Sequence, residues 1–141
     1  MIVLDTTVLS GLMRRAEEPA TIDWFDRQDV SQLWMTTISV HEIRYGIELQ
    51  PSRRRRRNLE RNFDDLLAAG FGSRVLPFDT SAAKLSASIA ARRYKAGTPA
   101  GLADTQIAGI AVSRNAALAT HNLRHFSDLP VPVIDLGAAS P

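Results

Sequence analysis

Three acidic residues lie at a strand end or near a helix start in this chain, and together their side chains could bind a metal ion. Asp5 comes directly after a short apolar run at residues 1–4, which is typical of a strand buried on both faces. Glu42 falls in the first turn of the helix expected after a second strand, and Asp104 falls near the start of a helix rich in small residues. Because ligands usually bind beyond the carboxyl ends of parallel strands, we expect the three carboxylates to converge there.

Carboxylates that converge repel one another, and at least one takes up a proton unless a cation lies between them. The chain contains no cysteine, so a metal ion would be bound by oxygen or imidazole. Mg²⁺ and Mn²⁺ prefer oxygen ligands and keep several waters, so a few carboxylates and a substrate phosphate are enough to bind them. Such an ion can activate water and neutralise the charge that develops when a phosphodiester is hydrolysed. The pattern therefore predicts metal-assisted hydrolysis.

Each acid also has a purely structural interpretation, which the sequence leaves open. Asp5 could simply cap the helix that follows it. Ser39 and Glu42 have the spacing of a capping box, in which the glutamate would only stabilise the start of its own helix. Asp104 could interact with the N-terminal dipole of its helix. The occurrence of all three acids at strand ends is what favours a metal site.

Alternating strands and helices are predicted, and this alternation would bring the acids to one edge of a sheet. Apolar runs indicate strands at residues 1–4, 33–37, 75–78, 117–120 and 131–136. Helices are expected to begin near residues 6, 17, 39, 53, 79 and 103. The order predicts a single α/β domain over residues 1–141, with a mainly parallel central sheet of about five strands flanked by helices.

Not every acid after a strand is expected at the site. Asp79 begins a strong capping sequence, and Pro77 suggests that the preceding strand lies at a sheet edge. A strand two positions from the centre is offset by about 9–10 Å, which is too far for a shared metal ion. Asp135 on the last strand is excluded for the same reason, whereas Asp128 lies in a loop and stays open.

The composition is that of an ordinary globular protein, with 45% hydrophobic and 23% charged residues. No apolar run is long enough to cross a bilayer. The strand-like N-terminus lacks the basic region and the long apolar region of a signal peptide. We therefore expect a cytoplasmic protein that has no membrane partner.

Arginine supplies most of the positive charge, since only two of the 17 basic residues are lysines and the net charge is +2. Five arginines occupy positions 53–57, and Arg54, Arg57 and Arg61 would share one helix face. That face could contact nucleic-acid phosphates or could simply be solvated. Both interpretations remain open at this stage.

Histidines and tryptophans offer weaker signals. His41, His121 and His125 are not expected to be metal ligands, because the histidine at 41 points to a different side of its helix from the neighbouring glutamate. The other two could touch substrate or pack locally. Trp24 and Trp34 could stack on bases, but they lie in segments where core packing is commoner.

Four segments, in this order, resemble the successive motifs of PIN-domain ribonucleases. The order and spacing are similar to those of VapC-type toxins of bacterial toxin–antitoxin modules, in the branch that includes FitB-like proteins. The segments are LDTTVLS at 4–10, SVHEIRYG at 39–46, LADTQIA at 102–108 and LATHNLRHF at 118–126.

The resemblance implies an endoribonuclease that depends on Mg²⁺ or Mn²⁺ and hydrolyses RNA phosphodiester bonds. It places Asp5, Glu42 and Asp104 at the acidic, metal-binding positions of the family. The chain departs from the family at Thr7, where an Asn is common, and at Asn122, which stands near the fourth acid of many relatives. Asn122 would belong to the catalytic group through its carbonyl oxygen, but it cannot act as a base. Supporting hydroxyls are implied at two positions, Thr6 and Thr120.

The resemblance also implies partners. A cognate antitoxin protein would cover the acidic pocket, and homodimers and toxin–antitoxin hetero-oligomers would form. Two other functions compete with this one. A haloacid-dehalogenase-like phosphatase would need a second aspartate at position 7, where the chain has Thr7. A non-catalytic PIN-like module that binds RNA or protein stays open because of Asn122.

Overall fold

The computed structural model describes residues 1–137 and contains one five-stranded sheet in which every pairing is parallel. The strand order is β3-β2-β1-β4-β5, so the first strand lies at the centre. The strands are β1 (Ile2–Leu4), β2 (Leu33–Thr36), β3 (Val75–Leu76), β4 (Ala117–Thr120) and β5 (Val133–Asp135). The predicted α/β class and the five parallel strands are confirmed.

Six helices and three short 3₁₀ turns connect these strands. The helices are α1 (Thr6–Met13), α2 (Pro19–Asp26), α3 (Thr37–Glu48), α4 (Arg53–Ala68), α5 (Thr80–Lys95) and α6 (Leu102–Ser113). The 3₁₀ turns are η1 (Val30–Gln32), η2 (Phe71–Ser73) and η3 (Leu123–His125). The predicted element ends differ from these bounds by a few residues, which is the usual uncertainty at helix and strand termini.

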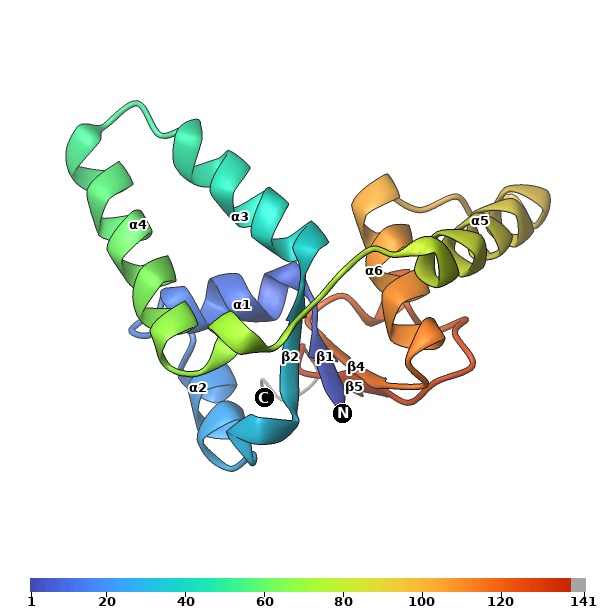
Figure 1. Ribbon diagram of the computed structural model, residues 1–141, viewed down its shortest axis with the longest axis horizontal. Coiled ribbons are helices and arrows are strands. Elements are labelled where there is room, and N and C mark those ends of the chain that lie inside the picture. The colour runs from blue at the N-terminus through green and yellow to red at the C-terminus, as the bar shows by residue number, and fades with distance from the viewer. Residues whose placement is uncertain (138–141) are drawn as a thin grey trace.

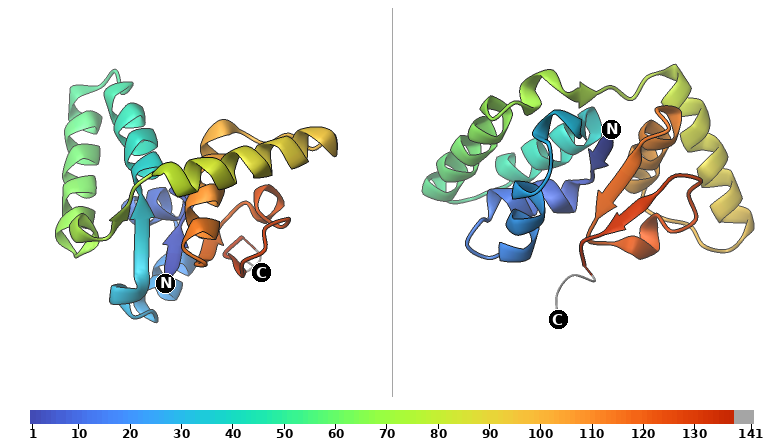
Figure 2. Two further views of the ribbon diagram at one scale, coloured as in Figure 1. Left: turned by 45° about the vertical axis from the view of Figure 1, so that its right-hand side comes forward. Right: turned by 90° about the horizontal axis from the view of Figure 1, so that it is seen from below.

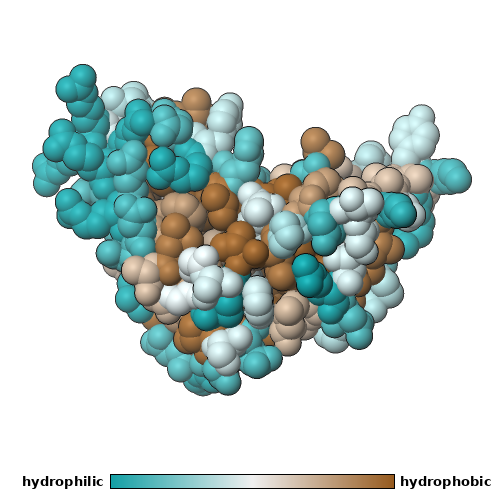
Figure 3. Space-filling model, viewed as in Figure 1, coloured by the Kyte–Doolittle hydropathy of each residue, from teal (hydrophilic) through white to brown (hydrophobic). Residues whose placement is uncertain are grey.

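Two pairs of helices diverge from the sheet like the arms of a V. The α3–α4 pair forms one arm and the α5–α6 pair forms the other (Figures 1 and 2). Apolar surface gathers in the hollow between the arms, while the outer end of the α3–α4 arm is strongly polar (Figure 3). Among residues 1–137, no helix has the length and apolar character needed to cross a membrane.

The central strand is buried on both faces, as its apolar run predicts. Leu4 packs in a cluster with α1, α3 and α4, whereas Val3 packs in a second cluster with α5 and α6. Both side chains are fully buried, because successive residues of a strand point to opposite faces. This packing holds the residue after Leu4 at a fixed position above the sheet edge.

The predicted capping box at the start of α3 is wrong. The helix begins at Thr37, and Thr36 is its N-cap, whose hydroxyl accepts a hydrogen bond of 3.1 Å from the backbone N–H of Ser39. Ser39 is buried, and its hydroxyl is used in contacts with Thr6 and Thr36. Glu42 therefore lies beyond the first turn and has no capping role.

The predicted positions of β3 and β5 at the edges of the sheet are confirmed, and they keep Asp79 and Asp135 away from the central strand. β3 and β5 each lie two positions from β1, on opposite edges of the sheet. Asp79 caps α5, since its carboxylate accepts a hydrogen bond of 2.9 Å from the N–H of Ala82. Asp135 pairs in register with Thr120 on β4, on the side away from β1. Neither acid follows β1 or a neighbour of β1.

Candidate active site

Asp5 lies at the end of the central strand and is almost completely buried, with 1% of its surface exposed. Oδ1 accepts hydrogen bonds from the Thr7 hydroxyl at 2.5 Å and from the Val8 N–H at 3.2 Å. Oδ2 accepts a hydrogen bond of 2.6 Å from the hydroxyl of Thr120 on β4. Asp5 is thus the N-cap of α1, as one of its two interpretations predicted. The cap uses only one of the two carboxylate oxygens.

The surroundings of Asp5 make its negative charge costly. Burial is the main cause that raises its pKa above the ordinary value. The hydrogen bonds from Thr120, Thr7 and Val8 lower the pKa and offset part of this effect, while the negative charge of Asp104 raises it. The effect of Asp104 is the smallest of these causes, so burial of Asp5 itself dominates.

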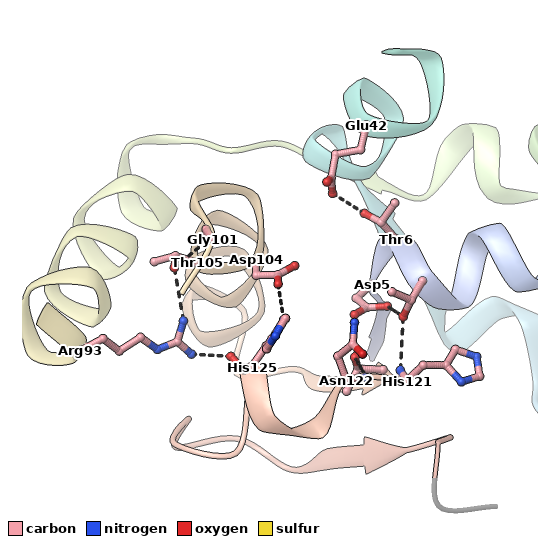
Figure 4. A network of polar contacts seen from close by, with 12 residues as sticks. Asp5, Thr6, Glu42, Arg93, Gly101, Asp104, Thr105, His121, Asn122 and His125 are labelled. Carbon is pink, nitrogen blue, oxygen red and sulfur yellow. Dashed lines mark hydrogen bonds and ion pairs between the residues drawn. The ribbon is translucent and has the colours of Figure 1, made fainter. Parts of the chain in front are cut away.

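Glu42 reaches toward the same sheet edge from α3. One of its oxygens, Oε1, accepts a hydrogen bond of 2.6 Å from the hydroxyl of Thr6, the residue next to Asp5. The Thr6 hydroxyl also lies 2.9 Å from the hydroxyl of Ser39. Figure 4 shows the glutamate extending from its helix toward Thr6. The predicted supporting hydroxyl at position 6 therefore contacts one of the predicted acids directly.

Asp104 lies in the first turn of α6 and is held by a histidine. Its Oδ2 lies 2.6 Å from Nδ1 of His125, at the end of η3 (Figure 4). Because an ionised carboxylate only accepts hydrogen bonds, this contact places the imidazole proton on Nδ1. His125 thus fixes one oxygen of Asp104 and leaves Oδ1 of that carboxylate for other partners.

The segment after β4 is tied to the same group of residues. The N–H of Asn122 donates to the Thr120 hydroxyl at 2.8 Å, and the N–H of His121 donates to the Thr7 hydroxyl at 3.2 Å. Asn122 is exposed and directly follows the strand that supports Asp5. The two threonines that bind Asp5 therefore also orient the backbone that carries Asn122.

The structure brings the predicted acids to one sheet edge but does not form a closed metal cluster. Asp5 and Asp104 interact electrostatically, and Glu42 binds the residue beside Asp5. Within residues 1–137, however, no three Asp, Glu, His or Cys side chains are grouped tightly enough to hold a metal ion. Two of the acids are instead bonded to other side chains, Glu42 to Thr6 and Asp104 to His125.

Other residues singled out in the sequence lie elsewhere. Arg54, Arg57 and Arg61 are exposed on α4, which is compatible with a solvated face. Trp24 and Trp34 are partly buried against the core clusters, so the core-packing interpretation holds for both. His41 is exposed and its ring stacks against Tyr45, whereas Nε2 of His121 lies 3.0 Å from the Thr21 hydroxyl.

Two contacts near the site had no signal in the sequence. One is the bond between His125 and Asp104, which are 21 residues apart on different elements. The other is the ion pair of 2.7 Å between Arg93 and Asp128, the loop acid that the sequence left open. Neither pair has a helical or strand spacing, so only the packing of α5, α6 and η3 could reveal them.

A groove of about 240 Å³ opens beside the acids between α1, α3 and α4. Thr6 and Glu42 are among the residues that line it, and most of its lining surface is apolar. The groove is lined further by Ser10, Met13, Arg14, Ile43, Gly46, Ile47, Gln50 and Leu59. An extended chain lying in this groove would therefore pass directly beside Glu42.

Comparison with known proteins gives several relatives of nearly the same length. The plasmid stability protein StbB of Pseudomonas syringae pv. tomato is 36% identical over 96% of this chain and 97% of its own length. The VapC ribonuclease Y4jK of Sinorhizobium fredii is 32% identical, with 96% of both chains covered. The toxin FitB of Neisseria gonorrhoeae is 27% identical over 96% of this chain and 97% of its own length.

Solved structures share the fold. The FitAcB structure from Neisseria gonorrhoeae aligns with a TM-score of 0.87 at 27% identity and covers 97% of this chain and 99% of the other. The DNA-bound VapBC structure from Salmonella typhimurium aligns with a TM-score of 0.75 at 32% identity, covering 96% and 97%. The sequence model of the PIN domain matches residues 2–131. The chain therefore belongs to the PIN domain family, as the four sequence motifs suggested.

Proposed function

We propose that this chain is a metal-dependent endoribonuclease and that Asp5, Glu42 and Asp104 bind its metal ion, Mg²⁺ or Mn²⁺. The observation that carries the proposal is the buried Asp5 carboxylate at the end of the central strand, with Glu42 and Asp104 around the same sheet edge (Figure 4). A divalent cation bound between such carboxylates would offset their mutual repulsion. The relative Y4jK, which is named a VapC ribonuclease, supports RNA as the substrate.

The donor atoms fit such an ion. Oδ2 of Asp5 accepts one hydrogen bond, from Thr120, and keeps a second lone pair. Within the described part of the chain, Oδ1 of Asp104 and Oε2 of Glu42 accept no hydrogen bond. When bound, a hard divalent ion would activate water and neutralise the charge that builds up on the phosphodiester. Asn122, next to this group, offers a neutral carbonyl oxygen.

The residues of the chain supply orientation. Thr7 donates a hydrogen bond to one oxygen of Asp5 and Thr120 to the other, so the carboxylate cannot rotate freely. Thr6 restrains Glu42, and His125 restrains Asp104. Each acid therefore has a neighbour that restricts its rotation, as is usual for groups that support metal ligands.

RNA cleavage tests this proposal. The wild-type chain is expected to cut labelled RNA with Mn²⁺ and to stop when EDTA is added, and Asp5→Asn and Asp104→Asn are expected to abolish cleavage. Asp79→Asn is the matched control, because that acid caps α5 outside the site and Asn is an equally good N-cap. Calorimetric titration with Mn²⁺ should show binding to wild type and to Asp79→Asn, and weak or no binding to the two site variants.

Cleavage that persists in both site variants would contradict the proposal. A second candidate function, a non-catalytic PIN-like module that binds RNA or protein, is favoured by Asn122 at the place of the expected fourth acid. Absence of cleavage by the wild type, together with retained RNA binding, would support that module instead.

We further propose that the chain acts in the cytoplasm as the toxin of a toxin–antitoxin pair. One relative is named a toxin, and a structural relative is a DNA-bound VapBC complex. The expected partner is a cognate antitoxin, in a hetero-oligomer built on a homodimer of this chain. Expression without the antitoxin should arrest bacterial growth, and Asp5→Ala should relieve the arrest. Equal harm from wild type and variant would show that the acidic site is not responsible.

A further inference from the structure

Arg93 on α5 is a buried arginine beside the site. Only 4% of its side chain is exposed, and burial of a charged group is costly unless it is fully paired. Its guanidinium donates to Oδ2 of Asp128 from Nε at 2.8 Å and to Oδ1 from Nη2 at 2.7 Å. This bidentate geometry is the strongest that an arginine and a carboxylate can adopt.

Arg93 also donates hydrogen bonds to Thr105, the neighbour of Asp104, and to His125, the residue that binds Asp104. Nη1 donates to the hydroxyl of Thr105 at 3.2 Å, the residue that follows Asp104 on α6. Nη2 also donates to the backbone carbonyl of His125 at 2.7 Å. The guanidinium therefore bridges the first turn of α6 and the end of η3, the two elements joined by the bond between His125 and Asp104 (Figure 4).

The neighbouring arginine shows what a surface ion pair looks like at the same place. Arg92 contacts the same acid, Asp128, but its side chain is 53% exposed and its closest approach to the carboxylate is 3.5 Å. A pair of that kind contributes little to stability. The hydrogen bonds from Arg93 are the main reason that the pKa of Asp128 is lowered to about 2.

We propose that Arg93 is a positioning residue that holds His125 against Asp104 and thereby orients that carboxylate for its role in the site. The proposal rests on the proposed function, in which Asp104 is a metal ligand. Asp128 fixes the guanidinium, and the guanidinium fixes both the carbonyl of His125 and the hydroxyl of Thr105. Without Arg93, η3 and α6 would still be attached to the core, but the backbone of His125 would lose its link to α6. The imidazole would then be held less firmly against Asp104.

A nuclear magnetic resonance measurement tests this without relying on catalysis. In protein labelled with ¹⁵N-histidine, the Nδ1–H signal of His125 reports the bond to Asp104, and the Asp104→Asn spectrum identifies it. Arg93→Met is expected to shift and broaden this signal. The signal of His121, which is bonded to Thr21 on the other side of the sheet, should stay unchanged and serves as an internal control.

Steady-state kinetics of RNA cleavage provide a second test. Arg93→Met is expected to reduce kcat for RNA cleavage about 10- to 100-fold, with KM changed less than about twofold because Arg93 is buried and does not touch RNA. The matched control is Arg92→Met, which removes a side chain of the same type from the same acid but should keep wild-type kcat and the wild-type His125 signal.

Arg93→Lys covers the case in which the methionine variant fails to fold. A lysine keeps the charge near Asp128, but one ammonium cannot reach that acid, the His125 carbonyl and the Thr105 hydroxyl together. The His125 signal should therefore still be perturbed in a folded Arg93→Lys protein. An unchanged His125 signal in every folded Arg93 variant would overturn the proposal. Absence of RNA cleavage by the wild type would refute the nuclease function and leave the resonance test decisive for Arg93.

Discussion

The hydroxyl of Thr120 donates a hydrogen bond of 2.6 Å to Oδ2 of Asp5, although the two residues lie 115 positions apart in the chain. The bond joins the ends of β4 and β1, which are neighbours in the sheet. It lies in the interior, since Thr120 is fully buried and Asp5 nearly so. The contact therefore links the proposed catalytic acid to the neighbouring strand β4 inside the protein.

Removal of this hydroxyl should destabilise the fold. Thr120→Val keeps the shape of the side chain but leaves Asp5 without its Oδ2 donor and the Asn122 N–H without its acceptor. We expect a loss of about 1–3 kcal/mol in the free energy of unfolding, since a hydrogen bond to a charged group is worth this much. Urea denaturation measures the change. Thr120→Ser keeps the hydroxyl and should lose clearly less, so an equal loss in both variants would contradict this explanation.

The raised pKa of Asp5 predicts how stability depends on pH when divalent ions are chelated. Below the ordinary value of 3.8 the carboxyl is protonated in both the folded and the unfolded chain. As pH rises through the higher pKa of the folded state, the buried group ionises at a cost, and its contribution to stability is lost. Asp5→Asn removes this effect, so in EDTA the variant should become more stable than wild type as pH rises above 3.8.

Urea unfolding of both proteins between acid and neutral pH measures this difference. The advantage of the variant should level off above the folded pKa, and added Mn²⁺ should reverse the order at neutral pH because the ion binds only the wild-type carboxylate. A variant less stable than wild type at neutral pH in EDTA would mean that the charge of Asp5 is favourable in the fold.

Thr6 should matter for metal binding more than for folding. Thr6→Val removes the hydroxyl that holds Glu42 at 2.6 Å, and a glutamate that is free to rotate binds an ion less well. We expect the affinity for Mn²⁺, measured by calorimetry, to fall about tenfold, which is typical of a lost contact behind a metal ligand. Thr6→Ser keeps the contact and should bind like wild type. Identical affinities for the valine and serine variants would exclude this role.

Gly109 controls how closely α6, which carries Asp104, approaches α5. A Cβ at position 109 would lie 2.6 Å from the carbonyl oxygen of Ala82 and 2.8 Å from Cβ of Ser86. Gly109→Ala should therefore push the helices apart and lower the free energy of unfolding by about 1–3 kcal/mol.

Gly46 in α3 is the matched control for that substitution. A Cβ there meets nothing within 4 Å, so Gly46→Ala should stabilise the protein by about 0.5–1 kcal/mol through helix propensity alone. Thermal denaturation compares the two variants. A loss of stability in both would show that the effect does not come from packing between α5 and α6.

The positions of single residues on their own elements could be predicted well. Asp79 caps α5, and Asp5 follows a strand that is buried on both faces. These predictions succeeded because they depend on periodicity and on contacts within a few residues. The capping box at Ser39 and Glu42 failed because Thr36 caps the helix three residues earlier, and the two side chains contact Thr6 instead.

By itself, the sequence determined the order of strands and helices and the acid that follows the central strand, because hydrophobic periodicity and local capping depend only on neighbours along the chain. The tertiary structure decided which side chains orient those acids. Thr120 binds Asp5, and His125 binds Asp104. Arg93 donates hydrogen bonds to the carbonyl of His125 and to the hydroxyl of Thr105, which follows Asp104 in the chain. Such contacts follow from how the helices pack on the two faces of the sheet, and no spacing along the chain encodes that packing.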